Sequence, residues 1–291
     1  MFPPRFRYEA PRTVAEVITL LHDGDGEAKV LAGGQSLVPL LKLRFASPEL
    51  LVDINNLPDL AYHRVDDTGA LRVGALCRHV DLERSTLVAE RQPTMAAAAP
   101  LIADPIVRSR GTLVGSLCHA DPQGDWAAVM VAMGGQVVAL GPNGRRTIAI
   151  GDFVTGPFQN TLAYDELAVE AVVPAARGLL RGGFLKLERR VGDFATAGAA
   201  VAVELDGDRV LRAGIALSGV GGHTINAQEA AESLTGHTLD DAAIARAADL
   251  SAQAAEPKSD HRGSAEYKRH VVHTFVTRIL SRVSTTQSKA A

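Results

Sequence analysis

The chain has 291 residues, of which 46% are hydrophobic, and its formal net charge at pH 7 is −3. That length is sufficient for two domains, and the balanced charge argues against a protein that holds nucleic acid through its phosphates. The two cysteines, Cys77 and Cys118, are too few for an iron–sulfur cluster and too far apart for a CxxC motif. Neither a secretory signal nor a membrane-spanning stretch is visible, so we expect a soluble cytoplasmic protein.

Hydrophobic periodicity and capping residues predict helices and short strands over the first 174 residues. The clearest helix start is at Thr13, because Glu16 follows at the spacing of a capping box and an apolar face comes next. A later helix should be interrupted at Pro93, which lacks a backbone donor. The other expected elements are strands at 28–33, 50–56, 71–76 and 166–174, helices at 86–102 and 125–135, and a hairpin at 136–150.

A small, glycine-rich segment at 174–183 is the expected boundary between two domains. Beyond it, two alternating stretches meet at Asp206-Gly207-Asp208, which is typical of a hairpin turn. The final helix carries a stripe of apolar residues between Val271 and Leu280. Such a stripe predicts that this end of the chain packs against another element.

Two glycine-containing turns each precede an expected helix. The first is Ala32-Gly33-Gly34-Gln35-Ser36; the second spans 111–116 and continues to Asp121 and Asp125, which could accept hydrogen bonds from sugar hydroxyls or a flavin N–H. Glycine permits positive φ and close approach, and successive N–H groups beside a helix start form an anion cradle. One such turn is usually only a turn, but two could hold one pyrophosphate. Neither a Rossmann GxGxxG unit nor a P-loop is present.

Three stretches in this order resemble the FAD-binding medium subunit of molybdenum hydroxylases, the xanthine dehydrogenase family, and most of all its carbon monoxide dehydrogenase type. They are LAGGQSLVPLLKLR from Leu31, RGTLVGSLCHADPQGD from Arg110 and FLKLERRVGDFATAGAAVAV from Phe184. The likeness covers nearly the whole chain.

The resemblance implies an α+β fold in two domains. A PCMH-type (vanillyl-alcohol-oxidase-like) FAD-binding domain is expected at 1–176, with subdomains at about 1–57 and 58–176. A small α+β domain of antiparallel sheet and helices, like the C-terminal domain of carbon monoxide dehydrogenase flavoprotein, is expected at 180–285.

The resemblance also implies FAD in this chain, [2Fe–2S] clusters in a small partner subunit and a molybdopterin cofactor in a large one. Substrate would be oxidised at molybdenum, and electrons would pass through the clusters and FAD to an external acceptor. The expected assembly is an (αβγ)2 heterohexamer without nucleic acid or an integral membrane segment. The substrate stays open between carbon monoxide, an N-heterocycle and an aldehyde, and the acceptor between quinone, cytochrome, oxygen and NAD.

The two glycine turns match the FAD loops of the family. Residues 32–36 match the first loop, and Thr112, Gly115 and Ser116 match the second, which is usually T-x-G-G. Val114 stands where the first glycine of that motif is expected. If this position needs positive φ, the β-branched side chain would be strained there; if only its N–H is needed, valine can serve.

Further residues are expected at the flavin by the same resemblance. Asp125 should contact the flavin or the ribityl chain, and Leu167 should lie against the isoalloxazine. Lys186, near N1 and the C2 carbonyl, would favour the anionic reduced flavin, unless it is an ordinary surface lysine. Phe194 either covers one face of the ring or fills the core. The full set of expected FAD contacts is Leu31, Ala32, Gly33, Gly34, Gln35, Ser36, Leu37, Ile102, Thr112, Val114, Gly115, Ser116, Ala120, Asp121, Asp125, Leu167, Lys186, Asp193 and Phe194.

Two other functions remain open. A stand-alone FAD-dependent reductase on the same fold, of the enolpyruvyl-UDP-sugar reductase type, would need its own substrate acid, and a non-catalytic binding protein would use the glycine turns only as turns. Ser36 and Ser116 lie in no GxSxG elbow, so no catalytic nucleophile is expected. His270 and His273 have no ligand nearby in sequence to complete a shell, so we expect no metal site.

Overall fold

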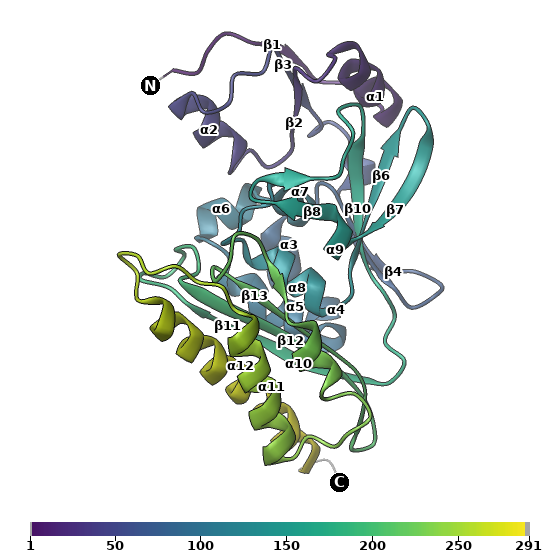
Figure 1. The fold of residues 1–291 in the computed structure, drawn as a ribbon. Helices are drawn as coiled ribbons and strands as arrows, with labels where there is room; N and C mark the ends of the chain where they lie inside the picture. Colours follow the sequence, from purple (N-terminus) through teal and green to yellow (C-terminus); the bar gives the residue numbers. More distant parts are fainter. Residues whose placement is uncertain (1, 289–291) are drawn as a thin grey trace.

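A computed structural model describes residues 2–288, and its three main sheets follow one another along the molecule (Figure 1). The N-terminal sheet lies at the top of the view, the second sheet in the middle and the C-terminal sheet at the bottom. The fold is therefore α+β, as the resemblance implied. None of the helices between residues 2 and 288 is long and apolar enough to cross a membrane.

The N-terminal sheet has three parallel strands in the order β1-β3-β2. Because the strands are parallel, β2 and β3 end at the same edge, where Leu31 lies opposite Asp53. The first glycine turn leaves the sheet at this edge. The elements of this part are β1 (Arg7–Glu9), α1 (Val14–Asp23), β2 (Ala28–Leu31), α2 (Leu37–Leu43) and β3 (Leu50–Asp53).

The predicted helix start at Thr13 is confirmed. The Thr13 hydroxyl accepts a hydrogen bond from the N–H of Glu16 at 3.2 Å, which satisfies one of the unpaired amides of the first turn. The Glu16 carboxylate accepts from the N–H of Arg12 at 2.7 Å. In a capping box this carboxylate would accept from the N–H of Thr13, the N-cap residue itself. Here it accepts from the residue before the N-cap instead.

The middle sheet has five antiparallel strands in the order β4-β5-β10-β6-β7. The predicted hairpin at 136–150 forms β6 and β7, and Gly144 takes a φ of +97° directly after the turn. The strands are β4 (His63–Val65), β5 (Leu71–Gly74), β6 (Gln136–Gly141), β7 (Gly144–Ala149) and β10 (Leu167–Val173), with a small separate pair of β8 (Val154–Gly156) and β9 (Gln159–Asn160).

Short helices connect and cover this sheet. The predicted interruption at Pro93 is confirmed, because one helix ends before it and the next begins with it. The helices are η1 (Pro58–Leu60), α3 (His79–Glu83), α4 (Thr86–Arg91), α5 (Pro93–Ala98), η2 (Ala99–Leu101), α6 (Pro105–Arg110), α7 (Leu113–His119), α8 (Asp125–Ala132) and α9 (Ile150–Phe153).

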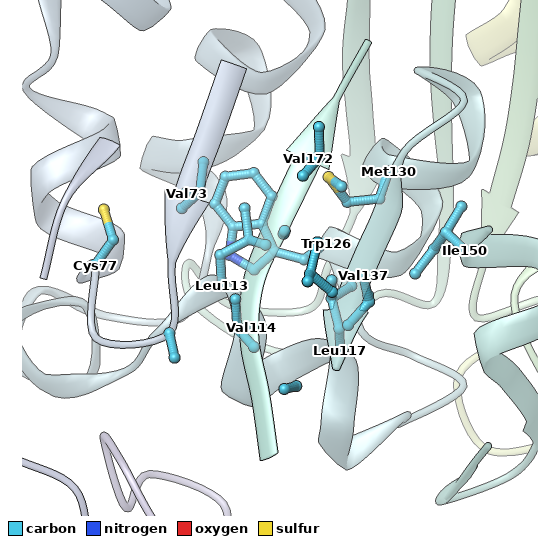
Figure 2. Packing of buried hydrophobic residues seen from close by; sticks show 14 of the residues in the cluster. Val73, Cys77, Leu113, Val114, Leu117, Trp126, Met130, Val137, Ile150 and Val172 are labelled. Atoms are coloured by element: carbon cyan, nitrogen blue, oxygen red, sulfur yellow. The ribbon is translucent and has the colours of Figure 1, made fainter. Parts of the chain in front are cut away.

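The core between this sheet and its helices is centred on Trp126, which is fully buried (Figure 2). Its indole N–H donates to Nδ1 of the buried His79 at 2.9 Å, so the one polar atom of the indole is satisfied. Burial and the nearby arginines lower the pKa of His79 to about 4, which keeps the imidazole neutral and able to accept this bond.

The C-terminal sheet is antiparallel in the order β11-β12-β13-β14, and both of its faces are covered. Alternate residues of β12 point to opposite faces: Ala200 and Ala202 join the core shared with the middle part, whereas Val201 and Val203 join a second core beneath α11 and α12 (Figure 1). The elements are β11 (Leu179–Leu187), β12 (Ala197–Asp206), β13 (Arg209–Ser218), β14 (Ile225–Asn226), α10 (Gln228–Glu232), α11 (Asp241–Ala254) and α12 (Ala265–Ser288).

The expected boundary at 174–183 is not wholly a linker, because β11 already begins at Leu179. Gly182 lies within this strand against α5, and a Cβ there would collide with the Thr94 hydroxyl and the Val201 carbonyl oxygen. The Thr94 hydroxyl donates to that same carbonyl at 2.7 Å. The glycine therefore allows the sheet to pack closely on α5. In the sequence alone, the same glycine indicates only a flexible linker.

Candidate cofactor-binding site

The two glycine turns lie against each other. A Cβ added to Gly33 would be 2.8 Å from Cα of Gly111 and would collide with the carbonyl oxygen of Arg110. Glycine at position 33 is thus required by the close approach of the second turn. Gly34 is required for a different reason, since its φ is +74°.

The first turn presents unused hydrogen-bond donors. Among residues 2–288, the amides of Gly33, Gly34, Gln35 and Ser36 find no acceptor, whereas the amide of Val38, inside the first turn of α2, bonds the Gly34 carbonyl at 3.0 Å. Successive amides of this kind form a concave anion site at a helix start. The predicted cradle is therefore present in the backbone geometry.

The second turn is the beginning of α7. The Thr112 hydroxyl caps the helix by accepting from the N–H of Gly115 at 3.1 Å. Val114 is in the first helical turn without a positive φ, and its side chain is buried in the core with Leu117 (Figure 2). The strain that positive φ would impose on valine is therefore absent, and the valine contributes packing instead.

A cavity of about 360 Å³ opens beside the first turn. Its wall carries two cations, Lys42 from α2 and Arg110 from the end of α6, and one anion, Asp53 from the end of β3. Positive charge next to free amides favours a diphosphate. The residues that line the cavity are Leu31, Ala32, Gly33, Gly34, Gln35, Val38, Pro39, Lys42, Asp53, Asn55 and Arg110.

A second group of expected residues meets around Lys186, whose side chain is only 1% exposed. Its ammonium donates to Asp125 Oδ2 at 3.0 Å, to the Leu101 carbonyl at 2.5 Å and to the Asp193 carbonyl at 3.1 Å, and Glu188 lies 3.2 Å away. The alternative that Lys186 is a surface lysine is therefore wrong. The lysine ties α8, η2 and the loop after β11 together.

Asp125 keeps one acceptor unused within this group. Its Oδ1 is buried and has no hydrogen-bond partner among residues 2–288. Burial raises the pKa of Asp125 to about 6, against the opposing effect of the Lys186 ammonium. The carboxylate is therefore mostly ionised at neutral pH and can accept a hydrogen bond from a ligand donor.

Helix α6 joins the two groups. Its start at Pro105 is separated by three residues from Leu101, whose carbonyl accepts from Lys186. At its end, Arg110 reaches the cavity wall. A six-residue helix spans about 9 Å, so an elongated dinucleotide can contact both groups.

Two sequence models of known families match almost the whole chain. The first, described as the FAD binding domain in molybdopterin dehydrogenase, matches residues 4–176, which is more than half of the chain. The chain belongs to this family of molybdenum-hydroxylase flavoprotein subunits. The second, described as the CO dehydrogenase flavoprotein C-terminal domain, matches residues 183–283.

Individual relatives agree with this flavoprotein family. The carbon monoxide dehydrogenase medium chain of Hydrogenophaga pseudoflava is 40% identical over 97% of this chain and 98% of its own length. The 6-hydroxypseudooxynicotine dehydrogenase complex subunit alpha of Paenarthrobacter nicotinovorans is 39% identical over 97% and 95%. A solved structure of H. pseudoflava carbon monoxide dehydrogenase matches with a TM-score of 0.91 and 41% identity over 97% of this chain and 98% of that one. The flavoprotein is thus a subunit of an oxidoreductase.

FAD is the cofactor of this flavoprotein subunit, and its residues fit that cofactor. The free amides of residues 33–36 and the cations Lys42 and Arg110 are suited to the pyrophosphate. The unpaired oxygen of Asp125 is suited to a donor on the flavin or its ribityl chain. The individual contacts between these residues and FAD stay predictions.

Some expected contacts lie away from the cavity. Leu167 is buried in the core at the start of β10, and Ala120 is a buried left-handed residue that ends α7 with a φ of +52°. Asp121 accepts from the N–H of Gln123 at 2.9 Å in the following turn. Phe194 is 52% exposed, so the interpretation that it fills the core is wrong.

The sequence reasoning missed the apolar cavity residues Val38 and Pro39 and all of the charged and amide ones outside the first turn, namely Lys42, Asp53, Asn55 and Arg110. A signal for two of them existed, because Asp53 and Asn55 end a predicted strand. Polar residues at the carboxyl ends of neighbouring parallel strands are a common place for ligands. Using it required knowing that β2 and β3 are paired and parallel, which the sequence pattern does not show.

Proposed function

We propose that this chain holds one FAD across the two glycine turns and works as the medium subunit of a molybdenum hydroxylase. It would receive electrons from [2Fe–2S] clusters of a small partner subunit and deliver them to an external acceptor. A large partner subunit would hold the molybdopterin cofactor, and the expected assembly is (αβγ)2. The observation that carries this proposal is the contact of Gly33 with the Arg110–Gly111 peptide, which places the start of the second turn against the donor-rich first turn beside one cavity.

Bound FAD would supply both one-electron and two-electron redox chemistry, and the protein would bind and orient it. The amides of residues 33–36, Lys42 and Arg110 would neutralise and position the diphosphate. The amide of Val114 would add a donor from the start of α7, where helix geometry leaves the first N–H groups without a partner in the helix.

At the flavin end, Asp125 would accept a hydrogen bond and Lys186 would hold its carboxylate in place. The same ammonium bonds the Asp193 carbonyl and therefore fixes the loop that carries Phe194. An exposed aromatic side chain on a fixed loop can cover one face of the ring. This arrangement would orient the flavin without supplying a catalytic acid or base.

We infer that this chain does not determine the substrate of the complex. Two relatives of nearly equal identity, 40% and 39%, belong to a carbon monoxide dehydrogenase and a 6-hydroxypseudooxynicotine dehydrogenase. Similar flavoprotein chains thus occur beside different oxidation reactions, so substrate choice would rest with the large subunit. We also infer a cytoplasmic location, where the unpaired Cys77 and Cys118 would stay reduced.

The proposal is tested by producing the chain together with its small and large partner subunits and measuring flavin content and acceptor reduction. We expect one FAD per copy of this chain, reduced when the complex oxidises its substrate, and no substrate turnover by the chain alone. A purified complex without flavin would contradict the proposal. Robust NADH-dependent or substrate-dependent turnover by the chain alone would favour the stand-alone reductase.

A further inference from the structure

A continuous polar bridge connects the two glycine turns. Asn55 donates from Nδ2 to the Ala32 carbonyl at 2.9 Å in the first turn. Its Oδ1 accepts from Nη2 of Arg78 at 2.6 Å, and Nη1 of Arg78 donates to the Arg110 carbonyl, also at 2.6 Å, at the second turn. We call this chain of contacts the Asn55–Arg78 bridge.

The backbone around Arg78 is attached to the second turn as well. Arg78 pairs with Thr112 as an isolated β-bridge, and the N–H of His79 donates to the Gly111 carbonyl at 3.0 Å. The N–H of Arg78 is itself held by the Asp81 carboxylate at 2.9 Å. The backbone of Arg78 is therefore held in place beside the second turn. Because its guanidinium also bonds Asn55, the length of the Arg78 side chain fixes the distance between the first and second turns.

The bridge joins parts of the chain that belong to different sheets. Ala32 and Asn55 follow β2 and β3 of the N-terminal sheet, whereas Arg78 follows β5 of the middle sheet. A ligand held between the turns requires both to stay at one separation, because misplacement of donors by about 1 Å weakens their hydrogen bonds severely. Arg78 is not among the residues that line the cavity, so it would act through others.

We propose that Arg78 is a positioning residue for FAD binding, which acts through Asn55 and the Arg110 carbonyl to fix the separation of the two glycine turns. This inference rests on the proposed function. Asn55 lines the cavity and can contact the cofactor directly, whereas Arg78 contributes only through the bridge.

The test measures the FAD dissociation constant of the co-produced complex after flavin removal. Arg78→Met keeps the length of the side chain and removes its donors, so we expect FAD affinity to fall about tenfold or more, as for loss of charged hydrogen bonds. Arg78→Lys should recover part of this loss. The control is Arg64→Met, since Arg64 is an exposed residue of β4 whose guanidinium lies 5.3 Å from the centre of the Tyr62 ring and which does not line the cavity. This variant should bind FAD as the wild type does.

A double-substitution cycle separates positioning from general destabilisation. If Arg78 acts through Asn55, Arg78→Met should cost a smaller factor in an Asn55→Ala background than in the wild type. Equal factors in both backgrounds, or wild-type affinity in Arg78→Met, would overturn the inference. A wild-type complex that takes up no FAD would instead refute the proposed function, and the inference with it.

Discussion

Gly33 lies directly against the carbonyl oxygen of Arg110, which is 77 positions further along the sequence, and only the absence of a Cβ at Gly33 allows this approach. A Cβ on Gly33 would also be 2.8 Å from Cα of Gly111, so backbone meets backbone at this point. Such proximity leaves no flexible atom that could move aside. The contact fixes how the first glycine turn lies on the second.

Gly33→Ala should therefore abolish FAD binding. The added methyl must push the two turns apart, and the amides of the first turn would then no longer face the Arg110 side of the cavity. The measurement is flavin content of the purified complex, with Gly151→Ala as the matched control, because a Cβ at Gly151 meets nothing within 4 Å. Full flavin content in Gly33→Ala would show that the turns need not touch.

Val114→Gly, which restores the glycine of the family motif, should weaken the protein. The valine is helical and only 2% exposed, so its removal leaves a cavity and adds a flexible residue to α7. We expect a loss of about 3 kcal/mol in the free energy of unfolding and no gain in FAD affinity. Val191→Gly is the control, because that side chain is 94% exposed. Tighter FAD binding by Val114→Gly would mean that the motif requires glycine.

Lys186→Met should destabilise the protein by about 3–5 kcal/mol at pH 8, because it leaves the Asp125 carboxylate buried without its cation. The folded-state pKa of Asp125, about 6, already lies above its unfolded value, so the folded state binds this proton more tightly than the unfolded state. The resulting contribution to the free energy of unfolding is fully present below pH 4 and is lost as pH rises through 6. Without Lys186 that pKa rises further. The destabilisation should accordingly be smaller at pH 5 than at pH 8 in denaturant unfolding.

The control for this pH dependence is Lys268→Met. Lys268 is also buried and bonds Asp260 at 2.7 Å, but the Asp260 side chain is exposed and its pKa is lowered by the lysine. Asp260 is then ionised in both folded and unfolded states from pH 5 to 8, so the effect of Lys268→Met should not change across that window. A flat profile for Lys186→Met as well would refute the buried ion pair.

Gly214→Ala should loosen the C-terminal sheet from the middle part of the chain. Gly214 lies in β13, where a Cβ would collide with the carbonyl oxygen of Ala132 at the end of α8. Forcing a methyl into such packing typically costs about 1–3 kcal/mol. Chemical unfolding of Gly214→Ala and of the control Gly222→Ala, where a Cβ meets nothing within 4 Å, checks this. Identical unfolding midpoints for the two variants would contradict the packing described here.

The sequence by itself determined the local elements and the family. Thr13, Pro93 and the Gly207 turn specify helix starts and a hairpin through their own backbone chemistry, which needs no distant partner. The three motifs likewise sufficed to name FAD and the flavoprotein family, since they depend on residue identity and order. What a residue does within a few positions of itself can be inferred from the sequence.

Only the tertiary structure decided which distant residues meet. Lys186 is buried because η2, α8 and the loop after β11 all supply acceptors to it, and an alternating strand gives no sign of that. The sequence places Gly182 in a linker, whereas in the fold α5 packs directly on it. Arg78 and Asn55 meet because two sheets bring their strand ends together. Contacts between remote segments depend on how the sheets pack, and this is a property of the whole chain that no short stretch encodes.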